Sequence, residues 1–373
     1  MEMLERYIEE LLEKSTPEYP IWNIEKVRSG EKTKWNYIDG CMIKAILEMY
    51  AITKNEKYLS FADNFIDYFV QEDGTIKDYE VEEFNIDNVN AGKTLFELYE
   101  LTGKEKYRKA IDTVYEQIKK QPRTQEGNFW HKKIYPYQIW LDGLYMAQPF
   151  YMEYEIKFNN KANCEDIYSQ FINVEKLMKD QKTGLYYHGY DSSRDIFWCD
   201  KETGLSQNFW LRAMGWYVMA LIDTLEKMDD KKSEAYVKLM AIFKDVVDAL
   251  LKYQDDSGMW YQVIDQGDRA GNYLETSGSA IMAYAILKGV RLGYLEEKYK
   301  AYGDKAFEGI CKKYLYEKNG EMHLGGICLV AGLGGKEKRD GSYEYYISEP
   351  VVENEAKGIA PLLLAYTELI REY

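Results

Sequence analysis

The stretch ELYELTGKEKYRKAI, residues 97–111, joins two helical patterns through a short polar link. A similar link recurs in EMYAITKNEKYLSFA, residues 48–62, and in DTLEKMDDKKSEAYVKL, residues 223–239. In each case the second helical pattern begins near a Tyr. Short links of this kind produce helix hairpins. The recurrence therefore predicts an array of helix pairs with a period of roughly 60 residues.

Helical periodicity is present in twelve segments of the chain. They cover residues 1–14, 36–52, 55–72, 88–102, 104–121, 142–158, 163–180, 206–228, 232–254, 275–294, 297–317 and 354–372. The second member of a pair often ends in a turn that carries glycine, which suits a positive φ angle. These turn glycines are Gly74, Gly127, Gly184, Gly258 and Gly320.

Six helix pairs either stack as an open solenoid or close into a ring of inner and outer helices. The segments AIMAYAILKGV, residues 280–290, and WYVMALIDTL, residues 216–225, are apolar or small on several faces. This pattern is typical of a helix that is packed on both sides. We therefore expect an all-α fold, a closed (α/α)6 toroid of six helix pairs that forms a single catalytic domain over residues 1–373.

The bulk composition excludes several classes of partner. A net charge of −15 opposes nucleic acid and anionic membranes, and no apolar stretch is long enough to span a bilayer. Five scattered cysteines without CxxC spacing, and an N-terminus without signal-peptide features, predict a cytoplasmic protein. Three histidines without HExxH spacing predict no metal site, and we expect no cofactor. The 35 Tyr and 8 Trp suit either core filler or a carbohydrate cleft.

An acid stands inside an apolar run in WLDGLYM, residues 140–146. Apolar surroundings disfavour the charged carboxylate and raise its pKa. The sequence therefore predicts that Asp142 is a proton donor at neutral pH. The alternative is a helix N-cap, because Asp is a preferred residue before a helical apolar run. The two roles can coexist.

A second acid occupies an equivalent position in the repeat. Asp87 lies in FNIDNVNAGKTL, residues 84–95, just before another inner helix and again among apolar neighbours. Two carboxylates in one cleft permit separate acid and base roles when their environments differ. Here too the alternative is an N-cap.

Loops that enter the inner helices of a toroid gather at one mouth, where they form a pocket. In GNFWHKK, residues 127–133, His131 and Lys132 suit recognition of an anion, and the alternative is a pair of solvated loop charges. His188 in TGLYYHGYD, residues 183–191, is a further candidate, although a lone histidine beside aromatic residues is commonly a packed one.

The helix SQNFWLRAMGWYVM, residues 206–219, carries Trp210, Arg212 and Trp216 in its first turns. Two indoles and a guanidinium can hold a sugar acid by stacking and bidentate pairing. The alternative places Arg212 on the surface and both Trp in the core. Ser277, in the small-residue start of another inner helix, would let a ligand approach closely.

Taken together these motifs resemble glycoside hydrolase family 105, the unsaturated rhamnogalacturonyl hydrolases. The resemblance runs in order along almost the whole chain, through WNYIDG (residues 35–40), IDNVNAGK (86–93), WLDGLYM (140–146), SQNFWLRAMGWYVM (206–219) and YLETSGSAIM (273–282). It implies a closed ring of six helix pairs. It also implies cytoplasmic action on short pectin-derived oligosaccharides that carry a 4,5-unsaturated uronic acid at the non-reducing end.

The resemblance also implies a mechanism and a set of site residues. Asp142 would protonate C4 of the unsaturated sugar and then activate the water that adds at C5, after which the hemiketal opens and expels the rest of the sugar. Asp87 would be the second acid. The first helix and residues 336–345 would set what lies beyond the terminal sugar. The substrate site would be shaped by Asn36, Tyr37, His131, Lys132, His188, Trp210, Arg212, Trp216 and Ser277.

Four other functions compete with this interpretation. An unsaturated glucuronyl hydrolase acting on glycosaminoglycan fragments is the nearest. A sugar epimerase with the same toroid would need paired histidines. An inverting polysaccharide hydrolase would need its carboxyl groups roughly 6.5–9.5 Å apart. A helical interaction scaffold would explain the repeat but not two acids among aromatic residues. The sequence leaves the oligomeric state open.

Overall fold

The computed structural model describes residues 2–371 and confirms all twelve predicted helices. Six of them form an inner layer: α3 (Tyr37–Thr53), α5 (Lys93–Thr102), α7 (Leu141–Phe158), α9 (Leu211–Lys227), α11 (Thr276–Arg291) and α14 (Ala356–Ile370). A 3-10 segment, η2 (Ile86–Gly92), leads directly into α5. The outer layer consists of α4 (Glu56–Asp67), α6 (Glu105–Lys120), α8 (Cys164–Met178), α10 (Glu234–Leu251), α12 (Lys300–Tyr314) and α1 (Glu2–Lys14).

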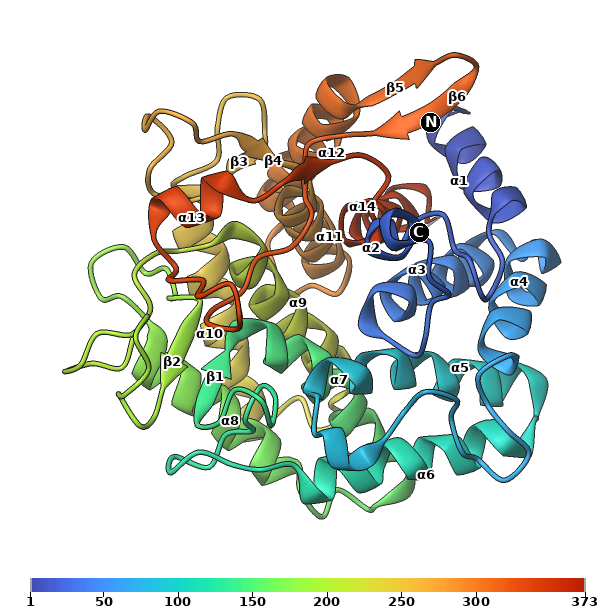
Figure 1. Ribbon diagram of the computed structural model, residues 1–373, viewed down its shortest axis with the longest axis horizontal. Coiled ribbons are helices and arrows are strands. Elements are labelled where there is room, and N and C mark those ends of the chain that lie inside the picture. The colour runs from blue at the N-terminus through green and yellow to red at the C-terminus, as the bar shows by residue number, and fades with distance from the viewer. Residues whose placement is uncertain (1, 372–373) are drawn as a thin grey trace.

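The inner helices form a ring. Helix α3 packs on α5 and η2, η2 packs on α7, and α7, α9, α11 and α14 follow in chain order, with α14 packed on α3. Figure 1 shows the same closure, because the colour passes around the molecule from blue to red and the red α14 lies beside the blue α3. The fold is therefore the predicted (α/α)6 toroid.

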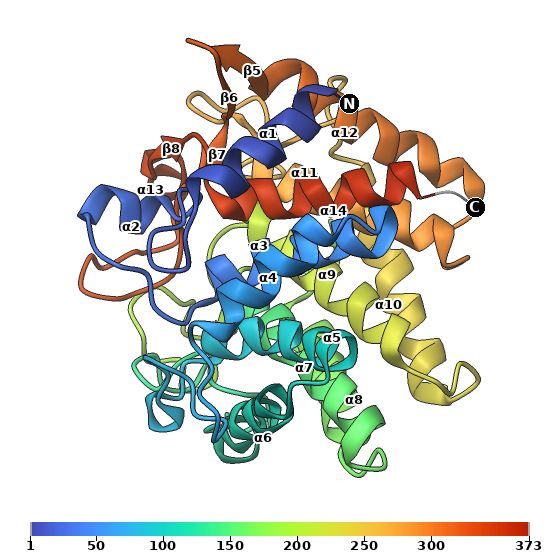
Figure 2. The same cartoon turned by 90° about the vertical axis from the view of Figure 1, so that its right-hand side faces the viewer.

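Burial separates the two layers as the sequence predicts. In α9 and α11 nearly every side chain is buried, since these helices pack on both sides. In α6 the buried side chains recur at helical spacing and the other face is charged. Helix α1 completes the outer layer over α14 (Figure 2), where the Tyr366 hydroxyl of α14 donates to the Glu5 carboxylate of α1. The first and last helices thus form the sixth pair.

Short elements that periodicity did not predict lie in the loops. They are α2 (Ile24–Ser29), α13 (Tyr343–Ser348), η1 (Val81–Glu83), η3 (Glu297–Tyr299) and four two-stranded antiparallel ribbons: β1 (Gln138–Trp140) with β2 (Gly189–Asp191), β3 (Trp260–Tyr261) with β4 (Leu274–Glu275), β5 (Leu315–Lys318) with β6 (Glu321–Leu324), and β7 (Ile327–Cys328) with β8 (Val351–Val352). The helix predicted from residue 206 begins only at Leu211, because Trp210 is extended and bridges Val263.

The five turn glycines all adopt the predicted positive φ. At Gly258 the space is also closed, because a Cβ would lie 2.3 Å from the Lys305 carbonyl oxygen. All five cysteines are unpaired thiols. None of the helices within residues 2–371 combines the length and the apolar character that a membrane crossing requires.

The end of the ring where the inner helices finish holds a charged cavity of about 320 Å³. Lys44 and Lys288 line it, and each contacts two carboxylates. Lys93 lines it too, but among the described residues no carboxylate lies within ion-pair distance. Its ammonium is 3.3 Å from the Tyr145 carbonyl oxygen and lies over the Tyr145 ring. Burial lowers the pKa of Lys93 from 10.5 to about 7.

We expect Lys93→Met to stabilise the protein, and more so in acid. The pKa of Lys93 is 10.5 in the unfolded chain and about 7 in the folded one. Between these values the unfolded chain binds more protons, so the stability of the parent protein rises with pH. The melting temperature should therefore rise more on substitution at about pH 6 than at about pH 9. Lys288→Met, which breaks ion pairs, should be destabilising at both; an equal response of the two variants contradicts the assignment.

Candidate active site

The inner helices begin at one mouth of the ring, and four of the predicted site residues share one position there. In each inner segment after α3, the second residue is polar or charged. The second residues are Asp87 of η2, Asp142 of α7, Arg212 of α9, Ser277 of α11 and Lys357 of α14.

Asp142 lies against a histidine. The side chain is 13% exposed, and its Oδ2 is 3.3 Å from Nε2 of His188, which is fully buried. The other ring nitrogen, Nδ1, is 2.7 Å from the Tyr346 hydroxyl. The ribbon of β1 and β2 creates this pairing, because Trp140 is in register with Gly189, the residue after His188. Asp142 is not an N-cap: the cap residue of α7 is Trp140, without a side-chain hydrogen bond.

The prediction of a raised Asp142 pKa is wrong. Burial acts to raise the pKa, but the contact with the His188 ring outweighs it, with a smaller contribution from His131, so the pKa of Asp142 lies below its ordinary value. Apolar sequence neighbours did not reveal this, because both histidines come from other loops. Asp142 is therefore a carboxylate at neutral pH, and a proton that it donates must come to it from its surroundings.

Asp87 is held by two cationic or hydrogen-bonding groups. Its Oδ2 is 2.7 Å from the Lys132 ammonium, and its Oδ1 is 3.4 Å from Nε2 of His131. The cap of η2 is Asn85, whose side chain accepts from the Asp87 N–H. The N-cap interpretation is thus wrong for Asp87 as well. The pair with Lys132 also shows that this lysine is a partner of Asp87 and not a solvated loop charge.

Trp140 links the two acid–histidine pairs. The His131 ring stacks on one indole at a centroid distance of 4.4 Å, and Tyr135 stacks on the same indole at 5.0 Å. The His188 ring meets it edge-on at 5.5 Å. Rings stacked in this way have fixed positions. Both histidines are consequently held with one nitrogen beside a carboxylate.

We expect His131 to remain neutral across the physiological range. Burial lowers its pKa to about 4, and the nearby Lys132 contributes in the same direction, although Asp87 opposes them. In an NMR titration the His131 ring signals should therefore not move above about pH 5. The chain has only three histidines, so His131→Gln assigns the signals. A His131 midpoint near the ordinary value of about 6.5 contradicts this prediction.

Arg212 is a buried cation without a carboxylate partner among residues 2–371. One guanidinium nitrogen, Nη1, donates to Ser277 Oγ at 3.1 Å and to the Cys328 carbonyl oxygen at 2.5 Å. The guanidinium also lies 4.7 Å from the centre of the Trp210 ring. Ser277 in turn donates to Glu275 Oε1 at 2.7 Å. The surface alternative for Arg212 is therefore wrong. Its guanidinium is buried, and no carboxylate of the described residues neutralises its charge.

The two indoles are core residues, as the alternative interpretation predicts. Trp210 donates through Nε1 to Gln262 Oε1 at 3.1 Å and packs on His188. Trp216 stacks on Tyr145 at 4.9 Å, where Tyr145 follows Asp142 by one helical turn. Both side chains are buried. They shape the site by fixing the residues around it.

Asn36 has a structural role. It is the N-cap of α3: its side chain accepts from the Asp39 N–H at 2.9 Å and donates to Asp39 Oδ2 at 2.6 Å. These bonds do not support its prediction as a substrate contact. Tyr37, by contrast, is only partly buried, and the charges of Lys357, Asp87 and Arg212 all act on its hydroxyl.

Several residues at this mouth escaped sequence reasoning. Lys357 is buried at the start of α14 and bridges Glu355 Oε1 at 3.0 Å and Glu25 Oε1 at 2.9 Å. The Tyr346 hydroxyl lies 2.7 Å from Nδ1 of His188, and the Tyr135 ring stacks on Trp140. The signal for Lys357 was available, because it occupies the same helix position as Asp142 and Arg212. The tyrosines gave no such signal, since Tyr135 lies in a loop and Tyr346 in the short helix α13, which periodicity did not predict.

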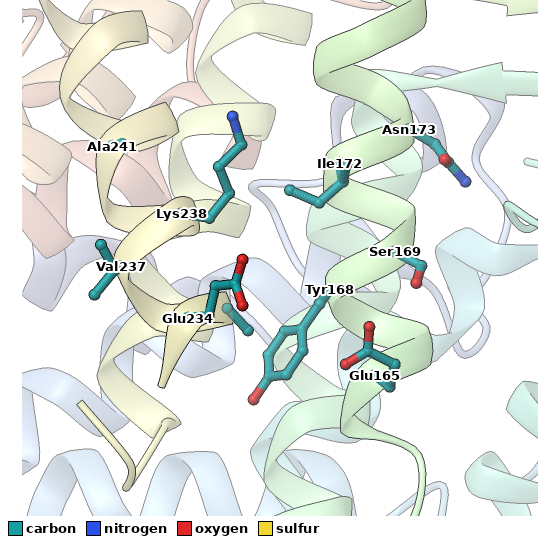
Figure 3. A pocket seen from close by; sticks show the side chains of 10 residues that line it. Glu165, Tyr168, Ser169, Ile172, Asn173, Glu234, Val237, Lys238 and Ala241 are labelled. Atoms are coloured by element: carbon teal, nitrogen blue, oxygen red, sulfur yellow. The ribbon is translucent and has the colours of Figure 1, made fainter. Parts of the chain in front are cut away.

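One groove on the surface lies apart from this site. A groove of about 730 Å³ runs between α8 and α10 on the outside of the ring, and Figure 3 shows its side chains, among them Tyr168, Ile172 and Lys238. It contains none of the predicted residues. Within residues 2–371, no group of three His, Cys, Asp or Glu side chains has the arrangement of a metal site.

Comparisons with known proteins identify the family of the chain. The family model described as Glycosyl Hydrolase Family 88 matches residues 7–373. A solved glycoside hydrolase from family 105 of C. acetobutylicum is 48% identical, with a TM-score of 0.90 and 98% of each chain covered. Protein Atu3128 of Agrobacterium fabrum is 40% identical over 230 residues, 60% of this chain and 97% of that protein. The unsaturated rhamnogalacturonyl hydrolase YesR of Bacillus subtilis is 28% identical over 264 residues, 69% of this chain and 72% of YesR.

Proposed function

Since the chain belongs to glycosyl hydrolase family 88 and is related to family 105, we propose that it removes a 4,5-unsaturated galacturonic acid from the non-reducing end of rhamnogalacturonan-derived oligosaccharides. The observation that carries this proposal is the combination at one mouth of the Asp142–His188 pair and the unpaired, buried Arg212. Its relative YesR, by name an unsaturated rhamnogalacturonyl hydrolase, supports the choice of substrate.

The proposed reaction is hydration of the double bond. Asp142 gives a proton to C4, and positive charge develops at C5 beside the ring oxygen. A water adds at C5 and returns a proton to Asp142, which restores the starting state. The resulting hemiketal opens, and the bond to the rest of the oligosaccharide breaks. Because the pKa of Asp142 is lowered, we assign the first proton to the Asp142–His188 pair as a whole, in which Nε2 of His188 lies beside the carboxylate.

The other site residues have supporting roles in this proposal. Arg212 binds the carboxylate of the unsaturated sugar, since a buried guanidinium without an acid favours an anionic ligand. Asp87, held by Lys132 and His131, accepts hydrogen bonds from the sugar hydroxyls and the water. Ser277 holds the Arg212 guanidinium in place by accepting a hydrogen bond from Nη1. Two histidines do meet at this mouth, as an epimerase would require, but the low pKa of His131 leaves it neutral at pH 7, so it would not serve as the general acid of such a pair.

The test uses lyase-generated disaccharides and follows the ultraviolet absorbance of the conjugated double bond. Loss of this absorbance on the unsaturated substrate, with no reaction of its saturated counterpart, is the expected result. In water enriched with heavy oxygen, the label should enter the released uronic fragment at C5. Label found only at C1 would instead support an inverting glycosidase and overturn the proposed chemistry.

A further inference from the structure

The start of α14 presents a cation whose charge is already compensated. Lys357 occupies the position of Arg212 and Asp142 in its helix, but its ammonium contacts two carboxylates, Glu355 and Glu25. Glu355 is itself buried, and its second oxygen accepts from the Ile24 N–H at 3.0 Å. Lys357 is therefore not free to bind an anion. It fixes the short helix α2, which carries Glu25, against the ring.

Glu25 is the exposed end of this network. Its side chain is 43% exposed, and only Oε1 contacts Lys357. Among the described residues, Oε2 has no hydrogen-bond partner. Burial acts to raise the pKa of Glu25, but the charges of Lys357, Arg212 and Lys132 lower it below its ordinary value. The Glu25 carboxylate is thus ionised. It is close enough to Arg212 and Lys132 at the mouth for their charges to lower its pKa.

Glu25 faces a hollow of about 820 Å³ beside that mouth. The opposite wall consists of the segment from Val330 to Glu349, which includes most of the loop 336–345. A hollow of this size accommodates a sugar ring or more. Its charged lining is mainly acidic: Glu25, Glu337, Asp340, Glu344 and Glu349 against Lys338 and Arg339. An excess of carboxylates repels an anionic ligand and offers acceptors to hydroxyl groups.

We propose that Glu25, held by Lys357, binds the sugar that follows the unsaturated uronate, which in the proposed substrate is an uncharged pyranose. The inference rests on the proposed function, because only an oligosaccharide cut at the unsaturated sugar places a second ring beside the mouth. Ionised Glu25 accepts hydrogen bonds from adjacent hydroxyls of that ring. The same carboxylate and its acidic neighbours disfavour a sulfated or carboxylated second sugar, which selects against glycosaminoglycan fragments.

The experiment compares two substrates that share the unsaturated uronate. One carries a methyl group at C1 and the other a neutral second sugar. The wild-type chain should turn over both, with the higher kcat/KM on the disaccharide. Glu25→Gln should lower kcat/KM on the disaccharide about tenfold, the order expected for hydrogen bonds to a charged group, and leave the methyl glycoside unchanged. Glu344→Gln is the matched control, because Glu344 lines the same hollow but pairs with Arg269.

A third substrate tests whether a negatively charged second sugar is disfavoured. A disaccharide with a sulfated second sugar should be poor for the wild type and improved by Glu25→Gln. If Glu25→Gln lowers kcat/KM equally on the methyl glycoside and the disaccharide, or leaves both unchanged, the second-sugar assignment is overturned while the proposed function stands. A wild-type chain inert on both unsaturated substrates overturns the proposed function, and this inference with it.

Discussion

Replacing Asp142 by Asn should lower kcat by about 10²–10⁴-fold, the contribution of a general acid–base group. The amide has the shape of the carboxylate and keeps the second position of α7, but it neither carries the proton to C4 nor accepts one from water. The contact with the fully buried His188 involves one oxygen, which the amide retains. The measurement is turnover of an unsaturated disaccharide, with circular dichroism and a melting curve for the fold.

Asp39→Asn is the matched control for this substitution. Asp39 also lies in the first turn of an inner helix and is buried, but it accepts hydrogen bonds from Trp22, Thr33 and Asn36. We therefore expect its loss to lower the melting temperature and to leave turnover per folded molecule close to that of the parent. Near-normal turnover of Asp142→Asn, with an unchanged fold, would contradict the role of Asp142.

The two aspartates also show what the sequence could and could not predict. Periodicity gave the twelve helices, and the repeat placed Asp87 and Asp142 at equivalent helix starts, because both signals are local in the chain. The pKa of each acid depends on groups from distant segments. Burial raises the pKa of Asp39 in spite of its four side-chain partners, whereas His188 keeps that of Asp142 low. Apolar neighbours in sequence therefore predicted burial but not charge.

The same contrast, between signals that are local in the chain and contacts from distant segments, explains why other contacts at the mouth were not predicted. His188 reaches Asp142 through the pairing of β1 with β2, and Tyr346 reaches His188 from the short helix α13, 158 residues later in the chain. The helical periodicity of the sequence reveals neither contact. It does mark Lys357, since this residue has the same position in its helix as Arg212. Comparison of equivalent positions in all six repeats would have found it, although not its two carboxylate partners.

Arg212→Ala should weaken productive binding of the unsaturated sugar, chiefly through KM. Truncating one partner of a buried, hydrogen-bonded charge pair costs about 2–5 kcal/mol, which corresponds to a loss of roughly 30-fold or more in kcat/KM. Arg212→Lys should recover only part of this loss. The guanidinium already uses Nη1 for Ser277 and Cys328 and offers further N–H groups in a fixed plane, and an ammonium has no such geometry.

Lys132→Ala distinguishes binding of the substrate carboxylate from positioning of Asp87. Its ammonium is already 2.7 Å from Asp87 Oδ2, whereas Arg212 has no carboxylate within the described chain. We therefore expect Lys132→Ala to lower kcat with a smaller change in KM, the opposite split from Arg212→Ala. If the Arg212→Ala variant is folded and has the KM of the parent, the guanidinium does not bind the substrate carboxylate, and backbone N–H groups and the hydroxyl of Ser277 become the groups to test.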